Sequence, residues 1–593
     1  MTINHNDHIG QEAVTTAELA PATFEPLLDL VSVAVPGGHW SSTELPSGIR
    51  MVAVDSADGG PVEVRLSVPL GDAAGYWHPQ GGWRRTLTAD WEGKAAVSLV
   101  DALATGCLYD HAGTTLLTFA AADPVPEARL RFGVSEETDS FVVQLLLPPA
   151  PGGHRLLFVP RSASVATAMR TLRAWYAAGI TPMPVPDGAR TPVYSTWYAF
   201  NQQVDADSVT AEAALATTLG FGALILDDGW QLGGHGRGYA GCGDWRPDPA
   251  KFPDLTAHVA EVRDLGLHYL LWVAPLLVGP DSEAYDRWRP TVRAGVPGAY
   301  VLDPRLPEVR AHVVALCVRL VRDHGLDGLK LDFLDEAMVH AGDGGPDVGR
   351  AMTELLAEVR RELELVRPGL LLELRQPYTG PGMAPYGNLL RSFDCPADST
   401  ANRVRTIDTA FLAIGGAVHS DMLLWHREAP AHSVARQLIG ALHSVPQVSV
   451  RLTEVPEDHR AAIAFWLGQW TRLRGVLLDG VVEPGRPDEL YPVVRADLDG
   501  TGLVSVHSEQ VVPVDLTWRQ ELVLVNGSAS DRIVLEVAEP GGETELTAYG
   551  PSGRIIERRP LGLAPGLHAL PVPRSGLAVL SGPVGATEVE GAE

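Results

Sequence analysis

DHGLDGLKLDFLD, residues 323–335, shows the sequence pattern from which the fold is predicted. It begins at the end of a helical segment, continues as an apolar run typical of a buried strand, and ends in polar residues. Strands of a parallel sheet read as such runs because helices cover both faces of the sheet. The same order of helical segment, apolar run and polar end recurs from about residue 190 to residue 480.

Eight apolar runs in this region predict eight strands: PVYSTWYAF (192–200), ALILDDGW (223–230), LHYLLWVAP (267–275), GLKLDFL (328–334), LLLELRQ (370–376), NLLRSFD (388–394), HSDMLLW (419–425) and QVSVRL (447–452). Helical segments separate most of them. Eight such units in about 290 residues fit an α/β fold, the (β/α)₈ TIM barrel. The alternative is a doubly wound open sheet, but that fold usually has fewer strands, and no glycine-rich phosphate loop follows the first strand here.

The flanking regions read differently from the barrel region, as short strands between Gly- and Pro-rich turns. We predict a flexible N-terminus over 1–24 and an N-terminal β-sandwich with a connecting helix over 25–180. The barrel then takes 181–482, and a C-terminal β-sandwich domain with a disordered tail takes 483–593. No internal repeat is evident beyond the period of the barrel itself.

The charge balance limits the classes of partner. The chain has 73 Asp and Glu against 46 Lys and Arg, for a net charge of −27. Nucleic-acid binding needs a positive surface, and anionic lipid also attracts positive charge, so neither is an expected partner. Only three of the basic residues are lysines, namely Lys94, Lys251 and Lys330. Coding bias explains the scarcity of lysine, but two of the three lie in the motifs described below.

Four scattered cysteines suggest reduced thiols in a cytoplasmic protein, because no CxxC spacing provides a zinc or redox motif. The first twenty residues lack a basic start and an apolar core, so they do not read as a secretory signal. No apolar run approaches the ~20 residues that span a bilayer.

Lys330 and Asp332 are the first candidates for chemistry. Side chains alternate along a strand, so both lie on one face while Leu331 takes the other. A neighbouring ammonium lowers the pKa of a carboxyl group and keeps it ionised. An ionised, fixed carboxylate is what a nucleophile at a sugar carbon requires. A structural ion pair in the barrel mouth is the alternative interpretation.

Asp394 is the second candidate, at the end of a later strand between Phe393 and Cys395. A carboxyl group among apolar neighbours tends to have a raised pKa, which suits a general acid. A solvated loop aspartate is the alternative, and Asp398 competes for the role. Two acids on non-adjacent strands can face each other across a barrel mouth, as the paired carboxylates of a glycosidase do.

Asp227 and Asp228 end the second strand, and their oxygens can accept hydrogen bonds from neighbouring sugar hydroxyls. Paired aspartates also hold Mg²⁺ or Ca²⁺, but no DxDxDG loop or histidine cluster accompanies them, so we expect no metal and no cofactor. Fourteen tryptophans fit a protein that stacks on sugar rings. Trp197, Trp230 and Trp245 lie near strand ends and suggest a stacking platform, although any single one can be core.

The motifs LDDGWQ (226–231), GDWRPDPAKFPD (243–254), LHYLLWVAP (267–275) and LDGLKLDF (326–333) together resemble the barrel of glycoside hydrolase family 36, the bacterial α-galactosidase (melibiase-like) group. The resemblance covers about residues 190 to 400. The flanking β-regions also match the family plan of N-terminal sandwich, barrel and C-terminal β-domain. The family belongs to a clan of barrel α-galactosidases and α-glucosidases.

The resemblance implies catalytic and binding roles. Asp332 would be the nucleophile, with Lys330 contacting ring hydroxyls beside it. Asp394 would be the acid/base, with Arg391 holding the 2-hydroxyl or orienting the acid.

Binding of the sugar itself would fall to residues of the second strand and the loop after it. Asp227 and Asp228 would bind the hydroxyls at positions 4 and 6, and Trp245 would pack against the sugar.

The sequence departs from the family pattern at three places. The acid/base segment reads RSFDCPADSTANR (391–403) instead of a Ser-Asp motif followed two residues later by Asp. The first strand reads YSTWYAF (194–200), without the family's Asn-Ser-Trp form. The fifth strand ends in ELRQPYTGPG (373–382) instead of a Cys- and Gly-rich motif, which places Arg375 where the substituent at C2 is chosen. An arginine there favours a negatively charged or differently substituted sugar, unless it is buried in an ion pair away from the pocket.

These observations predict a retaining exo-α-glycosidase acting on a small oligosaccharide or α-glycoside, and the resemblance favours an α-galactoside. A transglycosylase, an α-glycosidase of other specificity, a non-catalytic carbohydrate-binding protein and a metal-dependent hydrolase are the alternatives. Barrels with β-flanks often form homo-oligomers, but the sequence carries no interface signature.

Overall fold

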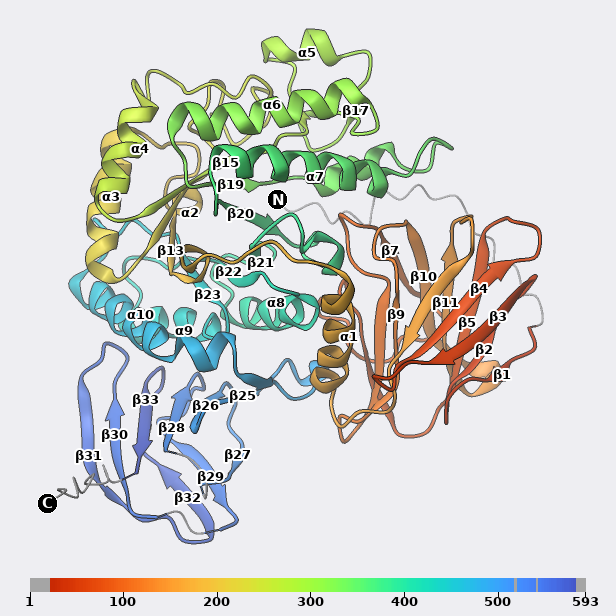
Figure 1. Cartoon of the computed structure of the whole chain (residues 1–593). Coiled ribbons are helices and arrows are strands. Elements are labelled where there is room, and N and C mark those ends of the chain that lie inside the picture. The colour runs from red at the N-terminus through yellow and green to blue at the C-terminus, as the bar shows by residue number, and fades with distance from the viewer. Residues whose placement is uncertain (1–21, 517–519, 540–541, 583–593) are drawn as a thin grey trace, which may run out of the picture.

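The computed structural model describes residues 22–516, 520–539 and 542–582. Eight parallel strands close into a barrel at its centre (Figure 1). They are β13 (Val193–Ser195), β14 (Ala223–Leu226), β15 (His268–Val273), β19 (Gly328–Leu331), β20 (Leu371–Arg375), β21 (Leu389–Arg391), β22 (Ala417–Leu423) and β23 (Val445–Val448). The prediction of a TIM barrel is confirmed. The apolar runs form these strands because both faces are covered, as in β14, whose four residues are all buried.

Helices surround the barrel and connect most of its strands: α3 (Ala206–Leu219), α4 (Leu255–Asp264), α6 (Pro307–His324), α7 (Val348–Val366), α8 (Ser399–Leu412), α9 (Ala431–Gly440) and α10 (Glu457–Leu478). Their ends follow local sequence signals. The Asp205 side chain caps the start of α3, and α3 and α6 end at Gly220 and Gly325 in the left-handed region. Only a 3₁₀ turn, Pro381–Met383, lies between β20 and β21 in place of a helix.

The N-terminal sandwich packs two six-stranded antiparallel sheets face to face. One sheet has the order β1 (Glu25–Pro26), β2 (Ser32–Ala34), β5 (Val62–Pro69), β11 (Ser140–Leu147), β10 (Ala128–Ser135), β7 (Gly93–Val97). The other has the order β3 (Gly38–Glu44), β4 (Arg50–Ser56), β12 (His154–Phe158), β9 (Thr115–Ala121), β8 (Thr105–Asp110), β6 (Ala73–Trp77).

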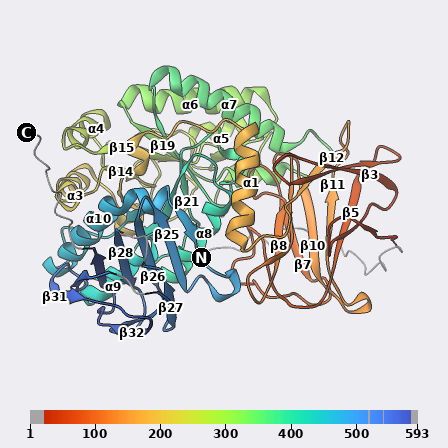
Figure 2. The same ribbon diagram turned by 60° about the horizontal axis from the view of Figure 1, so that its bottom comes forward.

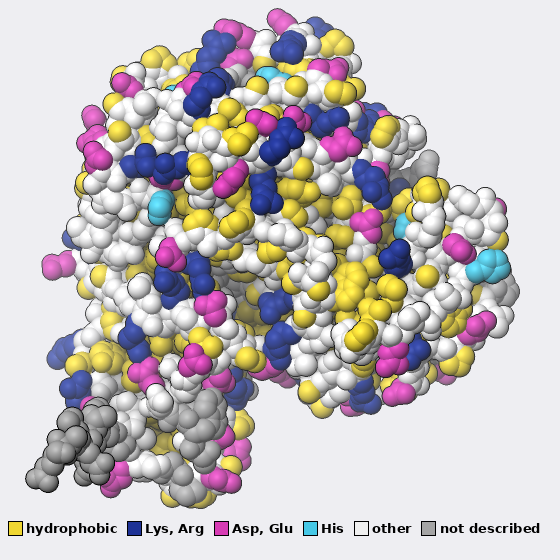
Figure 3. Space-filling model, in the orientation of Figure 1, with side chains coloured by type: hydrophobic (Ala, Val, Ile, Leu, Met, Phe, Trp, Pro, Cys, Tyr) yellow, Lys and Arg dark blue, Asp and Glu magenta, His cyan; other side chains and the backbone are white. Residues whose placement is uncertain are grey.

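Helix α1 (Val165–Gly179) joins the sandwich to the barrel and lies between them in both ribbon views (Figures 1 and 2). Its buried face packs in one cluster with residues of the sandwich, of α8 and of the C-terminal domain. Figure 3 shows apolar side chains gathered where the sandwich meets the barrel.

The C-terminal domain has a seven-stranded and a three-stranded sheet. The first contains β24 (Val481–Glu483), β25 (Val493–Leu498), β26 (Thr501–Val506), β28 (Glu521–Asn526), β33 (Leu577–Ser581), β30 (Thr544–Tyr549) and β31 (Ile555–Leu561). The second contains β27 (Val511–Val514), β29 (Ile533–Val537) and β32 (Gly566–Leu570). The predicted boundary after residue 482 falls inside β24, which already pairs with β25.

Two sequence-based expectations concern ends of the chain. The predicted flexible N-terminus and disordered tail lie almost wholly outside the described residues. Within the described ranges, no helix combines the length and apolar character needed to cross a membrane.

Candidate active site

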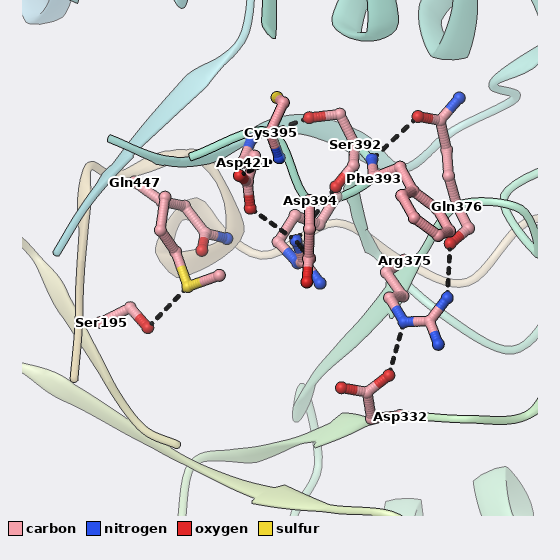
Figure 4. Close-up of polar contacts among 12 residues, drawn as sticks. Ser195, Asp332, Arg375, Gln376, Ser392, Phe393, Asp394, Cys395, Asp421 and Gln447 are labelled. Carbon is pink, nitrogen blue, oxygen red and sulfur yellow. Dashed lines mark hydrogen bonds and ion pairs between the residues drawn. The ribbon is translucent and has the colours of Figure 1, made fainter. Parts of the chain in front are cut away.

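The polar residues at the carboxyl ends of the barrel strands lie close together in the structure, as the barrel topology predicts. Strand register places Lys330 beside Glu373, and Arg375 beside Arg391. Figure 4 shows Asp332 and Asp394 on two sides of one space, with Arg375 reaching toward Asp332.

Asp332 is held by four donors. Its Oδ1 accepts hydrogen bonds from Arg375 Nε at 2.5 Å, from the Phe333 amide at 2.8 Å and from the Tyr378 hydroxyl at 3.4 Å. Its Oδ2 accepts one from Trp272 Nε1 at 2.9 Å. Burial opposes ionisation, but the charges of Arg375 and Lys330 outweigh it and hold the pKa of Asp332 well below its usual range. The carboxyl group is therefore ionised and fixed.

The Lys330 ammonium donates to Asp227 Oδ2 at 2.5 Å, and both side chains are buried. Burial disfavours the charged ammonium, but the Asp227 carboxylate outweighs this and raises the pKa of Lys330. Lys330 thus binds Asp227 directly, and its positive charge stabilises the ionised form of Asp332.

The Asp228 carboxylate accepts hydrogen bonds from two side-chain amides. Its Oδ2 accepts from Gln202 Nε2 at 2.6 Å, and its Oδ1 from Gln231 Nε2 at 2.7 Å. Burial raises the pKa of Asp228 to about 6. Asp227 and Asp228 are thus held by an ammonium and two amides, and no group of three metal-ligating side chains is found in the part of the chain that the structure describes.

Asp394 lies on the loop after β21, and its side chain is 43% exposed. Arg391 Nη1 lies 2.8 Å from Asp394 Oδ1 and also 2.8 Å from Asp421 Oδ1. Although burial opposes ionisation, the Arg391 guanidinium lowers the pKa of Asp394. The expectation that apolar neighbours raise the pKa of Asp394 is wrong, because the guanidinium of Arg391, three residues earlier in the chain, contacts the Asp394 carboxylate.

Asp421 on β22 carries the raised pKa instead. It is fully buried and accepts hydrogen bonds from the Cys395 amide at 2.6 Å and the Tyr198 hydroxyl at 3.1 Å. Burial, and then the Asp394 carboxylate, raise its pKa to about 7. The Arg391 guanidinium therefore binds two carboxyl groups, Asp394 with a lowered pKa and Asp421 with a raised one.

Arg375 is buried, and its guanidinium is 2.5 Å from Asp332 and 3.3 Å from Asp335. These ion pairs lie at the pocket and not away from it. Two carboxylates therefore share its positive charge.

The tryptophans differ from the expected platform. Trp230 and Trp245 are buried, and Trp245 packs edge-on against Trp272 at 5.6 Å between ring centres. Trp230 Nε1 also donates to the Trp272 carbonyl at 2.9 Å, so both rings pack around the residue whose indole N–H binds Asp332. Trp197 at the start of α2 (Trp197–Phe200) is half-buried, with the Arg237 guanidinium 5.9 Å from its ring centre.

The competitor Asp398 has a structural role, since its side chain caps α8 by accepting from the Ala401 amide at 2.8 Å. Sequence reasoning missed the role of Trp272, although alternation along β15 would have placed it on the face of Leu270. It also missed Tyr378 and Tyr239. Burial and the charges of Asp332, Asp228 and Asp394 raise the pKa of Tyr239, so this hydroxyl lies within electrostatic reach of all three acids.

Part of the chain matches a known protein family. Residues 170–353 match the Melibiase family model. The chain is 30% identical over 192 residues to an α-galactosidase from Escherichia coli, covering 31% of this chain and 26% of that protein. It is 31% identical over 152 residues to α-galactosidase 2 of Pediococcus pentosaceus, covering 24% and 20%. The matched segments thus span about a quarter of these relatives.

The likeness to solved structures extends over nearly the whole chain. The family 36 α-galactosidase AgaB of Geobacillus stearothermophilus superposes with a TM-score of 0.60 at 16% identity, covering 93% of this chain and 80% of that one. The α-galactosidase of Lactobacillus brevis gives a TM-score of 0.58 at 14% identity, covering 94% and 84%. At such identities the structures show a shared fold. The sequence matches point to α-galactosidases over part of the chain, and the solved family 36 structures share its fold.

Proposed function

We propose that the chain is a retaining exo-acting α-glycosidase that hydrolyses terminal α-galactosides. The observation that carries this is the pairing of an ionised, buried Asp332 with a half-exposed Asp394 across one space (Figure 4). The two acids would serve as nucleophile and acid/base.

In the first step an Asp332 oxygen attacks the anomeric carbon and the bond to the leaving oxygen breaks. Oδ2 is the better placed oxygen, since it has one donor where Oδ1 has three. Asp394 gives its proton to the leaving oxygen. In the second step Asp394 takes a proton from water, the water oxygen attacks the anomeric carbon, and Asp332 is released, so the configuration is retained.

Asp394 must carry a proton to begin this cycle, whereas Arg391 favours its ionised form. A bound sugar would displace water from this exposed carboxyl group and raise its pKa. Asp421 would also reduce the pull of Arg391 on Asp394, because it competes for the same guanidinium nitrogen.

The substrate class follows from the hydroxyl-binding acids and from the neutralised arginine. Asp227 and Asp228 are placed to accept from sugar hydroxyls, as the family resemblance implies for positions 4 and 6. Because Asp332 and Asp335 already pair with Arg375, we propose a neutral sugar and not a charged one. A variant of AgaA has been solved with raffinose, an oligosaccharide of the kind proposed here.

A panel of aryl α-glycosides that differ at C2, C4 and C6 tests this function. We expect turnover of the α-galactoside and an α-configured first product by NMR. A β-configured first product would overturn the retaining mechanism, and product analysis with an acceptor sugar would reveal transglycosylation. Absence of turnover on the whole panel would favour a binding protein, and loss of activity to a chelator would favour a metal-dependent hydrolase.

We also propose a cytoplasmic location. It is supported by the four cysteines, which are all free and buried.

A further inference from the structure

A cavity of about 390 Å³ lies near the amino ends of β13, β22 and β23, where α1 and the ends of α8 and α10 meet. The candidate active site lies at the carboxyl ends of the barrel strands, so this cavity is at the opposite end of the barrel. Its volume falls within the ~300–1,000 Å³ of small-molecule pockets. The cavity is therefore a candidate binding site that the proposed mechanism does not use.

Three arginines line this cavity: Arg170 and Arg173 on α1, and Arg190 before β13. The chain as a whole carries a net charge of −27, so positive charge gathers here against the general balance. Figure 3 shows basic side chains around a hollow between α1 and the C-terminal domain. Arg170 forms an ion pair with Glu483, and Arg190 forms one with Asp479.

Arg173 is the guanidinium without a counter-charge. Its Nη1 donates to the Ala410 carbonyl at 2.7 Å, and no carboxylate of the described ranges pairs with it. Burial, and then the positive charge of Arg170, lower the pKa of Arg173. Like charges that are partly withdrawn from water repel each other, and an anion bound beside them would offset this repulsion. Arg173 therefore has the properties of an anchor for an anion.

Uncharged polar groups complete the lining. Gly415 and Gly416 follow α8, and their backbone amides have no hydrogen-bond partner in the part of the chain that the structure describes. Gly415 has a φ of +85°, and left-handed residues in turns expose successive amides to anions. His443 adds a buried Nδ1 that also lacks a partner there, while its Nε2 lies 3.0 Å from the Ser505 hydroxyl.

The rest of the wall is apolar and includes Met169, Phe411 and Leu477. A single inorganic ion would leave most of this wall uncovered. A ligand that fills the cavity therefore has a carbon body as well as a charged group. Among anionic groups, phosphate suits the cationic part best, because its oxygens can accept from several guanidinium and amide donors at once.

We propose that this cavity binds a small organic molecule that carries a phosphate group, with Arg173 as the main anchor of the phosphate. The inference does not depend on the proposed glycosidase activity. The lining comes from α1, from the barrel and from the start of the C-terminal domain. A bound ligand would thus contact all three and stabilise their junction.

Isothermal titration calorimetry of the full chain with phenyl phosphate, at constant ionic strength, tests this proposal. We expect saturable binding at millimolar or lower concentration, and binding at least about tenfold weaker in Arg173→Gln, because a charge-assisted hydrogen bond is lost. Glu483→Gln should act in the opposite direction and tighten binding about threefold, because Arg170 loses its carboxylate partner. Arg436→Gln, an exposed arginine of α9 outside the cavity, is the matched control and should leave the affinity unchanged.

Several outcomes would overturn the proposal. These are no saturable binding of phenyl phosphate to the wild type, equal affinity for phenol, which lacks the anion, and an equal loss of affinity in Arg173→Gln and Arg436→Gln. An unchanged affinity in folded Arg173→Gln would overturn it as well. If Arg173→Gln does not fold, Glu483→Gln decides: tighter binding supports the proposal, and unchanged or weaker binding overturns it. Failure of the wild type to cleave any α-glycoside would overturn the proposed function alone.

Discussion

The charge of Asp332 depends on groups from several strands. Arg375 comes from β20, Lys330 from β19 and Trp272 from β15, and each acts on this carboxylate. A buried carboxylate without such partners would take up a proton, because burial alone raises its pKa. The ionised state of Asp332 is therefore a property of the barrel mouth and not of one residue.

Asp332→Asn removes the oxygen proposed to attack the anomeric carbon and keeps the size of the side chain. We expect kcat for an aryl α-galactoside to fall on the order of 10³-fold or more, while ligand binding measured by calorimetry persists. Asp335→Asn is the control, since Asp335 shares Arg375 but lies beyond it; its loss should be about tenfold. Equal losses in both variants would assign the effect to the charge balance of Arg375.

Lys330→Arg keeps the charge but not the shape. The ammonium is enclosed at 4% exposure against Asp227, and a planar guanidinium needs more room. Overpacking of this kind costs about 1–3 kcal/mol, so we expect kcat/KM to fall about 10- to 100-fold and the melting temperature to drop. Near-wild-type kinetics would show that the compact ammonium is not required.

At the scale of elements, β21 and β22 and the loop after β21 form one titrating unit. Arg391 ends β21, Asp421 lies on β22, and Asp394 lies on the loop between β21 and α8. Arg391 Nε is also 3.5 Å from Glu373 Oε1 on β20, so three carboxyl groups surround one guanidinium. The protons of this unit belong to the group and not to single residues.

We expect kcat/KM to fall as pH rises through about 7, where Asp421 loses its proton and the unit can no longer supply one. Asp421→Asn should move this alkaline limb to lower pH, because Arg391 then acts on Asp394 without a competing carboxylate. A pH profile of both proteins checks this. An unchanged alkaline limb would contradict it.

Asp421 also predicts a pH dependence of the free energy of unfolding. The pKa of Asp421 is raised from 3.8 to about 7 in the folded state, so the folded protein holds more protons than the unfolded chain between these pH values. Its stabilising contribution is full below pH 4 and is lost as pH rises to about 7, at up to about 1.4 kcal/mol per pH unit. Urea titrations of wild type and Asp421→Asn should show this slope as their difference. A difference that is flat from pH 4 to pH 7 would contradict it.

At the scale of the whole molecule, the three domains meet at Asp408. Arg85 and Trp77 reach it from the sandwich, and Tyr491 reaches it from the segment before β25. The surrounding cluster is apolar and also contains α1. This junction fixes the sandwich loop 79–85 against α8.

Asp408→Ala leaves the Arg85 guanidinium buried without a counter-charge. Such a loss costs about 3–5 kcal/mol, so we expect a clear fall in the denaturation midpoint. Asp479→Ala is the control, because its ion pair with Arg190 is half-exposed and should be worth no more than about 1 kcal/mol. Similar midpoints for the two variants would show that the junction is not a source of stability.

Much of the barrel could be predicted because its signals are local. Apolar runs, caps such as Asp205 and terminal glycines such as Gly220 act within a few residues. The placement of Asp332 and Lys330 at a strand end follows from the same pattern. Two of the three lysines were also informative: Lys330 binds Asp227, and Lys251 donates to the carbonyls of Gln202, Gly229 and Gly234 at 2.6–2.8 Å, which joins the loop after β14 to the segment before α3.

The burial of Trp245 could not be predicted, since it depends on Trp272 and Trp230 from other segments. The pKa values also could not be predicted. Apolar neighbours in sequence suggested a raised pKa for Asp394, but the fold brings Arg391 back to it and places the raised pKa on Asp421.

The barrel, its β-flanks, the candidate acids and the family resemblance could be predicted from the amino-acid sequence alone, because they depend on periodicity and on residues close together in the chain. The fold was needed to show which carboxyl group is ionised, which aromatic rings are exposed, and that the sandwich loop 79–85 lies against α8. These properties depend on burial and on electrostatic fields, which arise from residues far apart in sequence. Asp408 and Arg85 are 323 residues apart and yet form one buried ion pair.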